Sequence, residues 1–383
     1  MIIRTARILL AAAAVAVFAS SAFASTSGVI NRFAFDTARI LGQDSGTYFF
    51  SPYSIISAFG MAYAGASGDT AAEMERSLGF TKELHGELDE LARVLKDGQY
   101  LSSANRVWLR TGLNLSKEYQ DTLLLYYGSR AVKLNIKDKT EASRKIINNW
   151  VSGKTNGKIP SLLSSLDPST QMIITNAVYF KAEWQSRFSK KLTAPEKFRD
   201  GDKVTEVPMM KKNSDFQYAE IDGVKIIRLP YKGRRVSMFV VLPPEDKPEA
   251  LDALDAEAFS GLVNAMSKYK VDLWLPKFRT EESYQLADIF KALGVKQAFT
   301  NLADFSGITE DTALKIDAVV HKTFIEVDEE KTEAAAVTGL GLLGATMMPS
   351  PTPKAVFHAD HPFTYFIVDD ESGTILFMGR QTF

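Results

Sequence analysis

Apolar residues recur along this chain as continuous runs and as alternating patterns, and both kinds of pattern predict β-strands. Gln171–Phe180 is almost entirely apolar, which predicts a central strand that is buried on both faces. Ile226–Leu229 and Val236–Leu242 flank a turn at Gly233, so this region predicts a β-hairpin. Further runs that predict strands are Leu273–Leu275, Ile316–Val327, Ala355–Phe357, Phe363–Val368 and Ile375–Met378.

Helical patterns lie between these runs without regular alternation. Glu141–Val151 predicts a helix that ends in the region of Gly153 and Gly157. Thr70–Glu73 is a capping-box sequence, which favours a helix start, and Gly79 predicts the end of that helix. A third helical stripe is formed by Leu251, Leu254, Phe259, Leu262, Val263 and Met266. Strands and helices mixed in this way predict an α+β fold.

A long segment near the C-terminus has neither pattern. Asp328–Val337 reads DEEKTEAAAV and follows the strand-like run that ends at Val327. Thr338–Lys354 consists almost only of Gly, Ala, Leu, Met, Thr, Ser and Pro, and Lys354 is its only charged residue. Loops longer than about 12–15 residues are uncommon in compact domains and are usually functional. We therefore expect the function to depend on this segment.

The first part of this segment carries small residues at every second position. They are Thr332, Ala334, Ala336 and Thr338. Because side chains alternate between the two faces of a strand, these four would share one face if the segment became extended. All four are small enough to lie above a packed core between existing strands. The pattern predicts a segment that is able to become an additional strand.

Composition places the chain among globular proteins and gives no sign of subdivision. It has 383 residues, 45% of them hydrophobic, and it contains no Gly/Ser linker, internal repeat or charge block. We therefore expect one domain over residues 25–383. The net charge is −1, from 45 basic and 46 acidic residues, which gives no electrostatic reason to expect nucleic acid or an anionic membrane as partner.

The N-terminus has the pattern of a targeting segment. Arg4 and Arg7 form a basic region, Ile8–Phe18 is apolar, and Ala22–Ala24 is an A-x-A cleavage sequence. We expect residues 1–24 to be a signal peptide and the mature chain to start near Ser25. Loss of the two arginines changes the net charge from −1 to −3. A membrane anchor is the alternative, but the apolar run is too short to span a bilayer and no second run of 18 follows.

The absence of cysteine excludes several chemistries. With no Cys, the chain has no disulfides, no thiol nucleophile and no lipid-modified N-terminal cysteine. No GxSxG sequence is present, and none of His85, His321, His358 and His361 has metal-ligand spacing. Gly339–Gly344 matches GxGxxG, but a dinucleotide site needs a helix after the motif and a proline-rich stretch follows here. We expect no enzyme activity, no cofactor and no metal.

Several motifs in order along the chain resemble those of the serpin family. They are Phe50–Ser54 (FSPYS), Asn176–Trp184 (NAVYFKAEW), Asp304–Ile308 (DFSGI), Glu329–Thr338 (EEKTEAAAVT), Asp360–Phe363 (DHPF) and Leu376–Arg380 (LFMGR). The resemblance covers about Asn31 to Arg380. It implies an α+β serpin fold, with a large central, mostly antiparallel sheet, further sheets and about eight to nine helices. It also implies an exposed reactive loop at about residues 329–354. With the targeting segment, it indicates a bacterial exported member, periplasmic or secreted.

The resemblance also assigns roles to residues outside the loop. It implies a shutter, where the central strands part, made by Ser51, Ser54, Asn176 and His321. It implies a breach, at the point of loop entry, made by Trp184, Lys277 and Glu329. For His321, an ordinary hydrogen-bonded core histidine is the alternative to this role. The pair Glu329–Lys277 is equally an exposed ion pair worth about 0–1 kcal/mol.

Within the loop the resemblance implies a hinge and a reactive bond. The hinge is Glu329, Glu330, Lys331, Thr332, Glu333, Ala334, Ala335, Ala336, Val337 and Thr338. Counting Glu329 as the seventeenth residue before the bond gives Ala345–Thr346, whereas counting back from Phe357 gives a position near Met348–Pro349. A bond before proline is a poor substrate, and we favour Ala345–Thr346 because of the length of the segment between the hinge and this bond. Thr332 to Ala345 would then span about 46 Å as a strand, at ~3.3 Å per residue.

These assignments imply a monomeric inhibitor that works as a suicide substrate through loop cleavage and insertion into a metastable fold. Ala345 suits an elastase-like serine protease, whereas Met347 or Met348 would suit a chymotrypsin- or subtilisin-like enzyme; a cysteine protease is a further alternative. No Arg or Lys lies between Thr332 and Pro353, which disfavours a trypsin-like target. Lys331 stands where inhibitory serpins commonly have Gly, so a non-inhibitory serpin-fold binding protein, cleaved without trapping, is the alternative function.

Overall fold

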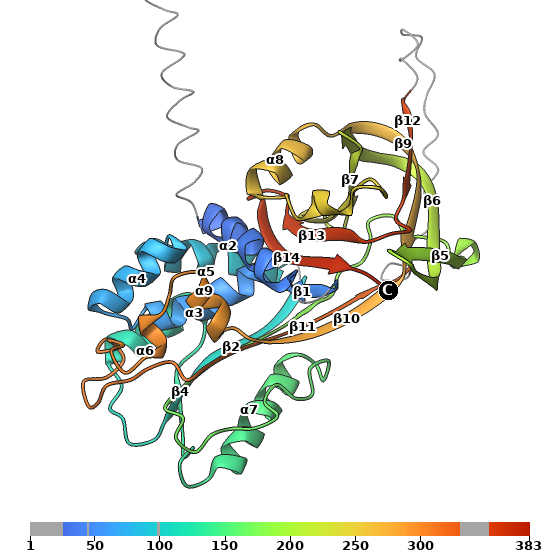
Figure 1. The fold of residues 1–383 in the computed structure, drawn as a ribbon. Helices are drawn as coiled ribbons and strands as arrows, with labels where there is room; N and C mark the ends of the chain where they lie inside the picture. Colours follow the sequence, from blue (N-terminus) through green and yellow to red (C-terminus); the bar gives the residue numbers. More distant parts are fainter. Residues whose placement is uncertain (1–25, 44–45, 98–99, 330–351) are drawn as a thin grey trace, which may run out of the picture.

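The computed structural model describes residues 26–43, 46–97, 100–329 and 352–383, which form two β-sheets with helices packed around them (Figure 1). The eight α-helices of the described residues are α2 (Thr26–Leu41), α3 (Pro52–Tyr63), α4 (Gly68–Leu78), α5 (Leu84–Asp97), α6 (Lys117–Tyr127), α7 (Thr140–Lys154), α8 (Ala256–Asn264) and α9 (Ala287–Ala292). Three short 3-10 helices are η1 (Lys190–Leu192), η2 (Pro248–Leu251) and η3 (Gln297–Phe299).

The smaller sheet has five strands. In spatial order they are β10 (Phe278–Gln285), β11 (Ala318–Val327), β4 (Met172–Phe180), β2 (Leu101–Arg110) and β3 (Val132–Leu134). The sheet is mixed, because β10–β11 and β4–β2 are antiparallel whereas β11–β4 and β2–β3 are parallel. All nine residues of β4 are buried, as the continuous apolar run predicts for a central strand.

The larger sheet has nine strands. They are β1 (Tyr48–Phe50), β14 (Thr374–Gln381), β13 (Phe363–Asp369), β8 (Val236–Leu242), β7 (Val224–Pro230), β6 (Lys203–Ile221), β9 (Ser267–Pro276) and β12 (Lys354–His358) in order, with β5 (Ala194–Asp200) paired to β6. β6 is 19 residues long and pairs with β5, β7 and β9, so it joins two parts of this sheet. The predicted β7–β8 hairpin is present.

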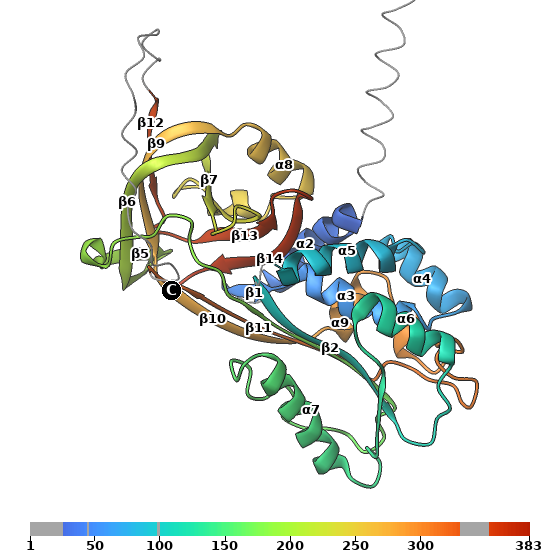
Figure 2. The ribbon, with the colours of Figure 1, turned by 180° about the vertical axis from the view of Figure 1, so that it is seen from behind.

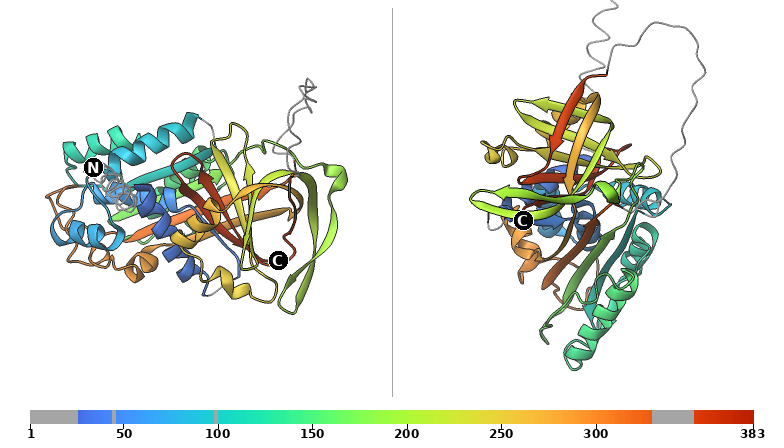
Figure 3. Two further views of the ribbon diagram at one scale, coloured as in Figure 1. Left: turned by 90° about the horizontal axis from the view of Figure 1, so that it is seen from above. Right: turned by 90° about the vertical axis from the view of Figure 1, so that its right-hand side faces the viewer.

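The helices are distributed unequally over the five-stranded sheet. α7 lies against one face of this sheet (Figure 2). Ile147 and Val151 of α7 share a hydrophobic cluster with Ile173 and Ala177 of β4. α3 packs on the opposite face, against β2, β4 and β14. Seen from above, the blue and teal helices lie at one end of the molecule and the nine-stranded sheet at the other (Figure 3). The expected α+β fold is confirmed in this architecture.

Two details differ from the sequence patterns and one agrees. α4 starts at Gly68 and not at Thr70, because the Thr70 hydroxyl accepts a hydrogen bond from the Asp304 amide (2.9 Å) and does not cap the helix. α7 ends at Lys154, between Gly153 and Gly157, as the sequence predicts. The apolar stripe from 251 to 266 is divided between η2 and α8, because Asp255 caps the start of α8. Among the described helices, none combines the length and the apolar character that crossing a membrane requires.

Candidate functional site

The line along which β4 and β11 meet runs through the middle of the five-stranded sheet, and we call it the seam. Its register runs from Ala318 beside Ile173 to Phe324 beside Tyr179. Both strands point the same way, whereas each has an antiparallel neighbour on its other side. A strand that ran in the opposite direction between β4 and β11 would therefore be antiparallel to both. Parallel pairs are slightly less stable per residue than antiparallel ones, so such an insertion would improve the pairing.

A cluster of polar side chains lies at the seam beneath α3. Ser51 caps this helix, since its hydroxyl accepts the Ser54 amide (3.1 Å) and donates to the Leu376 carbonyl (2.6 Å). The Ser51 amide donates to Nε2 of His321 (3.1 Å). Ser51, Ser54, Asn176 and His321 are all fully buried, so the structure brings together the four residues predicted for the shutter.

His321 and Asn176 are direct neighbours across the seam. Because Nε2 of His321 accepts the Ser51 amide, the ring proton is on Nδ1, which donates to Oδ1 of Asn176. The amide nitrogen of Asn176 donates in turn to the Ser54 carbonyl (3.0 Å) and to Oδ1 of Asn105 (2.6 Å). The cluster therefore links β11, β4, β2 and α3, and parting β4 from β11 requires breaking the His321–Asn176 hydrogen bond.

Burial makes this cluster uncharged. It lowers the pKa of His321 from 6.5 to about 3, against the opposing effect of its hydrogen bond with Asn176. The imidazole is therefore neutral near pH 7. A buried polar group without a hydrogen-bond partner costs about 1–3 kcal/mol, so the cluster is stable only while its members remain together.

A second group of contacts lies where the chain leaves β11. Glu329 is only 4% exposed, and one carboxylate oxygen accepts from Nζ of Lys277 (2.7 Å) while the other accepts from the Thr193 hydroxyl (2.7 Å). Burial raises the pKa of Glu329, but the Lys277 ammonium and the Thr193 hydroxyl outweigh burial, so the net shift is downward. The ion pair thus joins the buried carboxylate of Glu329 to Lys277, which lies between β9 and β10.

Trp184 completes this group. Its indole Nε1 donates to the Asp328 carbonyl (2.9 Å), and its ring stacks on Tyr231 with centroids 4.5 Å apart. Asp328 and Glu329 are the last described residues before position 330. The structure therefore brings together the three residues predicted for the breach, and it holds the exit from β11 by hydrogen bonds from two side chains and an ion pair.

Sequence reasoning missed two members of these groups. Asn105 lies in β2, whose sequence LSSANRVWLR has neither alternation nor a continuous apolar run. Thr193 lies between η1 and β5 in a stretch without a recognisable pattern. No signal in the sequence points to either residue, because their roles arise only from the pairing of distant segments.

Most of the predicted loop lies outside the described residues. This applies to the hinge residues after Glu329, namely Glu330, Lys331, Thr332, Glu333, Ala334, Ala335, Ala336, Val337 and Thr338, and to the reactive bond Ala345–Thr346. These assignments stay predictions. Lys354, the expected last residue of the loop, is already the first residue of β12.

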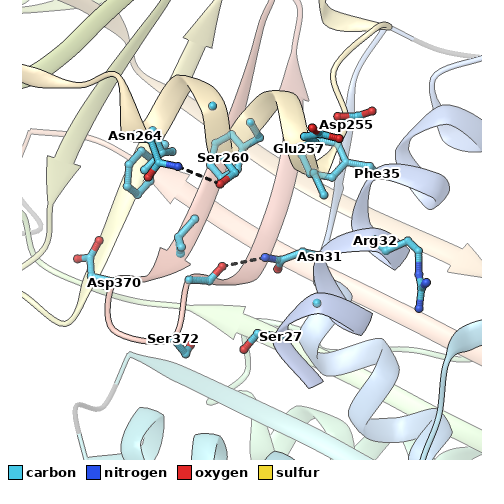
Figure 4. Close-up of a pocket in the computed structure, with 18 of the residues that line it drawn as sticks. Ser27, Asn31, Arg32, Phe35, Asp255, Glu257, Ser260, Asn264, Asp370 and Ser372 are labelled. Carbon is cyan, nitrogen blue, oxygen red and sulfur yellow. Dashed lines mark hydrogen bonds between the residues drawn. The ribbon is translucent and has the colours of Figure 1, made fainter. Parts of the chain in front are cut away.

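A groove of about 1070 Å³ lies away from both groups, between α2, α8 and the β13–β14 connection (Figure 4). Phe35 and Phe259 line it, and Asn31 at its edge donates to the Gly373 carbonyl (2.9 Å). None of the predicted site residues that the structure describes lines this groove. In the part of the chain that the structure describes, no group of His, Cys, Asp and Glu side chains is arranged to hold a metal ion.

Comparison with known proteins gives concordant results. A family model described as "Serpin (serine protease inhibitor)" matches residues 29–382. The chain is 41% identical to an uncharacterized serpin-like protein of Thermococcus kodakarensis, with 92% of this chain and 84% of that protein covered. It is 36% identical to the leukocyte elastase inhibitor of Homo sapiens, with 92% and 98% covered.

Solved structures agree with these sequence matches. A crystal structure of maspin superposes with a TM-score of 0.85 at 28% identity, and the match covers 94% of this chain and 99% of maspin. The structure of uncleaved ovalbumin gives a TM-score of 0.83 at 27% identity, with 93% and 99% covered.

Proposed function

Because the chain belongs to the serpin family, a family of protease inhibitors and not of enzymes, we propose that it is an exported suicide-substrate inhibitor of a serine protease. The observation that carries the proposal is the parallel seam between β4 and β11, beside which the chain leaves β11 toward the predicted loop. A segment that turns back after β11 runs antiparallel to it. The seam is the position where such a segment pairs favourably on both sides.

The chemistry would begin as ordinary proteolysis. The protease serine oxygen attacks the carbonyl carbon of Ala345, the bond to Thr346 breaks, and Thr346 leaves as a free amine. The protease is then bound to Ala345 as an ester. Thr332 to Ala345 would enter the seam as a strand of about 46 Å, at ~3.3 Å per residue, and carry the protease away before water hydrolyses the ester.

An elastase-like enzyme is the target that the sequence favours. Alanine fits the small pocket of such proteases, and no basic residue lies between Thr332 and Pro353. A relative with 36% identity is named leukocyte elastase inhibitor, which supports the same specificity here. Met347 or Met348 would instead direct the chain to chymotrypsin- or subtilisin-like enzymes.

The decisive experiment is to mix the mature chain with an elastase-like serine protease and analyse the products in SDS. We expect a covalent complex and a released peptide that begins at Thr346, identified by mass spectrometry. A peptide that begins at Met348 would move the bond two residues on. Complete cleavage of the loop without any complex would contradict inhibition and favour a serpin-fold binding protein.

A matched substitution tests the bond independently. Ala345→Arg should redirect trapping to a trypsin-like protease, because that pocket requires a basic side chain. Thr346→Arg, the adjacent residue on the leaving side, should not do so. If both variants behave alike, Ala345 is not the residue that donates the acyl group.

We also propose export, with residues 1–24 removed and Ser25 as the first residue. The support is the basic, apolar and A-x-A succession at the N-terminus. Expression of the full-length chain in a bacterial host should yield protein in the periplasm or medium that starts at Ser25. Ala24→Leu should prevent the cleavage, because the residue before the cut must be small. Recovery of chains that keep residues 1–24 would contradict the proposal.

A further inference from the structure

The connection between α7 and β4, residues 155–171, passes over the seam, and we call it the connector. Ile159, Leu162 and Leu163 share a hydrophobic cluster with Ala177 of β4 and Val320 of β11. The connector is fixed to α7, because Oδ1 of Asn148 accepts the amides of Leu162 (2.9 Å) and Leu163 (2.8 Å). It is fixed to β11 as well, because Nζ of Lys322 donates to the Ser161 carbonyl (3.1 Å).

One residue of the connector contacts both strands of the seam at once. The ammonium group of Lys158 lies 5.8 Å from the ring centroid of Tyr179 on β4 and 5.6 Å from that of Phe324 on β11. Tyr179 and Phe324 are direct neighbours across the seam, and their rings are 5.4 Å apart. Both rings are buried, with exposed fractions of 4% and 1%. A cation within about 6 Å of an aromatic centroid is attracted by the ring.

This double contact depends on a closed seam. Strands lie about 4.8 Å apart, so an additional strand between β4 and β11 roughly doubles their separation. The side chains of the new strand then occupy the space between Tyr179 and Phe324. The Lys158 ammonium can remain over one ring only, and one of its two attractions is lost.

We propose that Lys158 is a positioning residue that holds the seam closed across Tyr179 and Phe324, so that its charge sets the rate at which the seam admits a strand. The inference rests on the proposed function, since that function requires the seam to open. The inference goes beyond the proposed function, because it assigns control of the seam's opening to a cation–aromatic contact made by the connector.

The fold provides a matched control for the charge. The guanidinium of Arg279 on β10 lies 4.8 Å from the centroid of the same Phe324 ring. β10 and β11 are neighbours on one side of the seam, so this contact does not bridge β4 and β11. Removing the Arg279 charge takes a similar attraction from the same ring but leaves the opening of the seam unaffected.

The experiment uses the intact protein and a synthetic peptide with the sequence of residues 332–345, TEAAAVTGLGLLGA. The rate of peptide incorporation is followed by native electrophoresis for the wild type, Lys158→Met, Lys158→Arg and Arg279→Met. We expect Lys158→Met to be about two- to fivefold faster, which corresponds to the loss of one exposed cation–aromatic contact. Lys158→Arg and Arg279→Met should both match the wild type.

Two results would overturn the proposal. One is an equal rate for Lys158→Met and the wild type. The other is an equal acceleration in Lys158→Arg, which would show that packing of the lysine stem matters and its charge does not. If neither the wild type nor any variant takes up the peptide, the proposed strand insertion is rejected. The role of Lys158 in keeping the seam closed is then tested separately by amide hydrogen exchange. Amides that pair β4 with β11 must exchange faster in Lys158→Met than in the wild type, and unchanged exchange rejects its role.

Discussion

At the scale of residues, the two polar groups differ in how they tolerate burial. The cluster around His321 is neutral and relies on mutual hydrogen bonds, because burial keeps the imidazole uncharged. The group around Glu329 keeps a charge, which Lys277 and Thr193 stabilise. The first group therefore responds to acid and the second to removal of its cation, and each response leads to a measurable prediction.

Because of His321, the free energy of unfolding should decrease as the pH is lowered. The unfolded chain binds a proton at this residue near pH 6.5, whereas the folded chain does so only near pH 3. Between these values the unfolded state holds one proton more, so acid favours unfolding by up to about 1.4 kcal/mol per pH unit. This contribution to stability is complete above pH 6.5. Urea unfolding between pH 7 and pH 4 should give a steeper loss for the wild type than for His321→Gln; equal slopes would reject the assignment.

Removing Lys277 should cost more stability than removing the charge of Glu329. Lys277→Met leaves a carboxylate that is 4% exposed with only Thr193 as partner, whereas Glu329→Gln leaves a lysine that is 35% exposed. We expect about 1–3 kcal/mol or more for the first change and less than about 1 kcal/mol for the second, because an unpaired buried charge is the more costly. Denaturant unfolding of both variants measures this. The double variant should be no less stable than Lys277→Met alone; additive losses would contradict the pairing.

Some residues of the two polar groups could be identified from the sequence and others could not. His321 was recognisable because it interrupts an apolar run, and Glu329 because it opens the loop. Asn105 and Thr193 were not, since a hydrogen bond such as that from Asn176 to Asn105 joins positions 71 residues apart. Local patterns encode burial and chain direction, whereas side-chain partners depend on which strands become neighbours.

At the scale of elements, the feature on which the proposed function depends is the parallel pairing of β4 and β11 at the seam. β4 and β11 were predictable as strands, and the continuous apolar run of β4 even indicated its central place. Their parallel pairing was not predictable, because it joins segments about 145 residues apart. The same limitation applies to β6, whose 19 residues have mixed burial because they pass through environments set by β5, β7 and β9.

The direction of side chains in the inserting strand gives a prediction with an internal control. Ala334 belongs to the predicted face of small residues, so Ala334→Arg would place a charge above the core when the strand inserts. Burial of an uncompensated polar group costs roughly 2–7 kcal/mol, which opposes insertion. Insertion should slow, and the protease should hydrolyse the ester and escape. Ala335→Arg alters the next residue, on the opposite face, and should keep trapping. The ratio of complexed to cleaved chains in SDS gels distinguishes them; equal ratios would reject the alternating face.

At the scale of the whole molecule, the five-stranded sheet is surrounded by elements that are already well packed. α3 and the nine-stranded sheet bury one face, and α7 with the connector covers the other. The parallel seam in its centre is therefore the place where the molecule can still gain pairing without rebuilding a core. If the proposed insertion takes place, the fold is less stable before the loop is cut than after it, because cleavage would free the segment to reach the seam.

Cleavage in the loop should therefore raise the thermal midpoint of the protein. The insertion of Thr332–Ala345 would replace one parallel pairing by two antiparallel ones, with net hydrogen bonds of about 1 kcal/mol each. For a chain of this size, each kcal/mol of stabilisation raises the thermal midpoint by about 2 °C. Several kcal/mol therefore correspond to a midpoint that is roughly 10 °C higher or more. Calorimetry before and after limited digestion with an elastase-like protease measures it. The nicked Ala334→Arg variant should show no such rise, because its strand cannot insert. A wild-type midpoint that stays constant or falls on nicking would mean that the seam does not admit the loop.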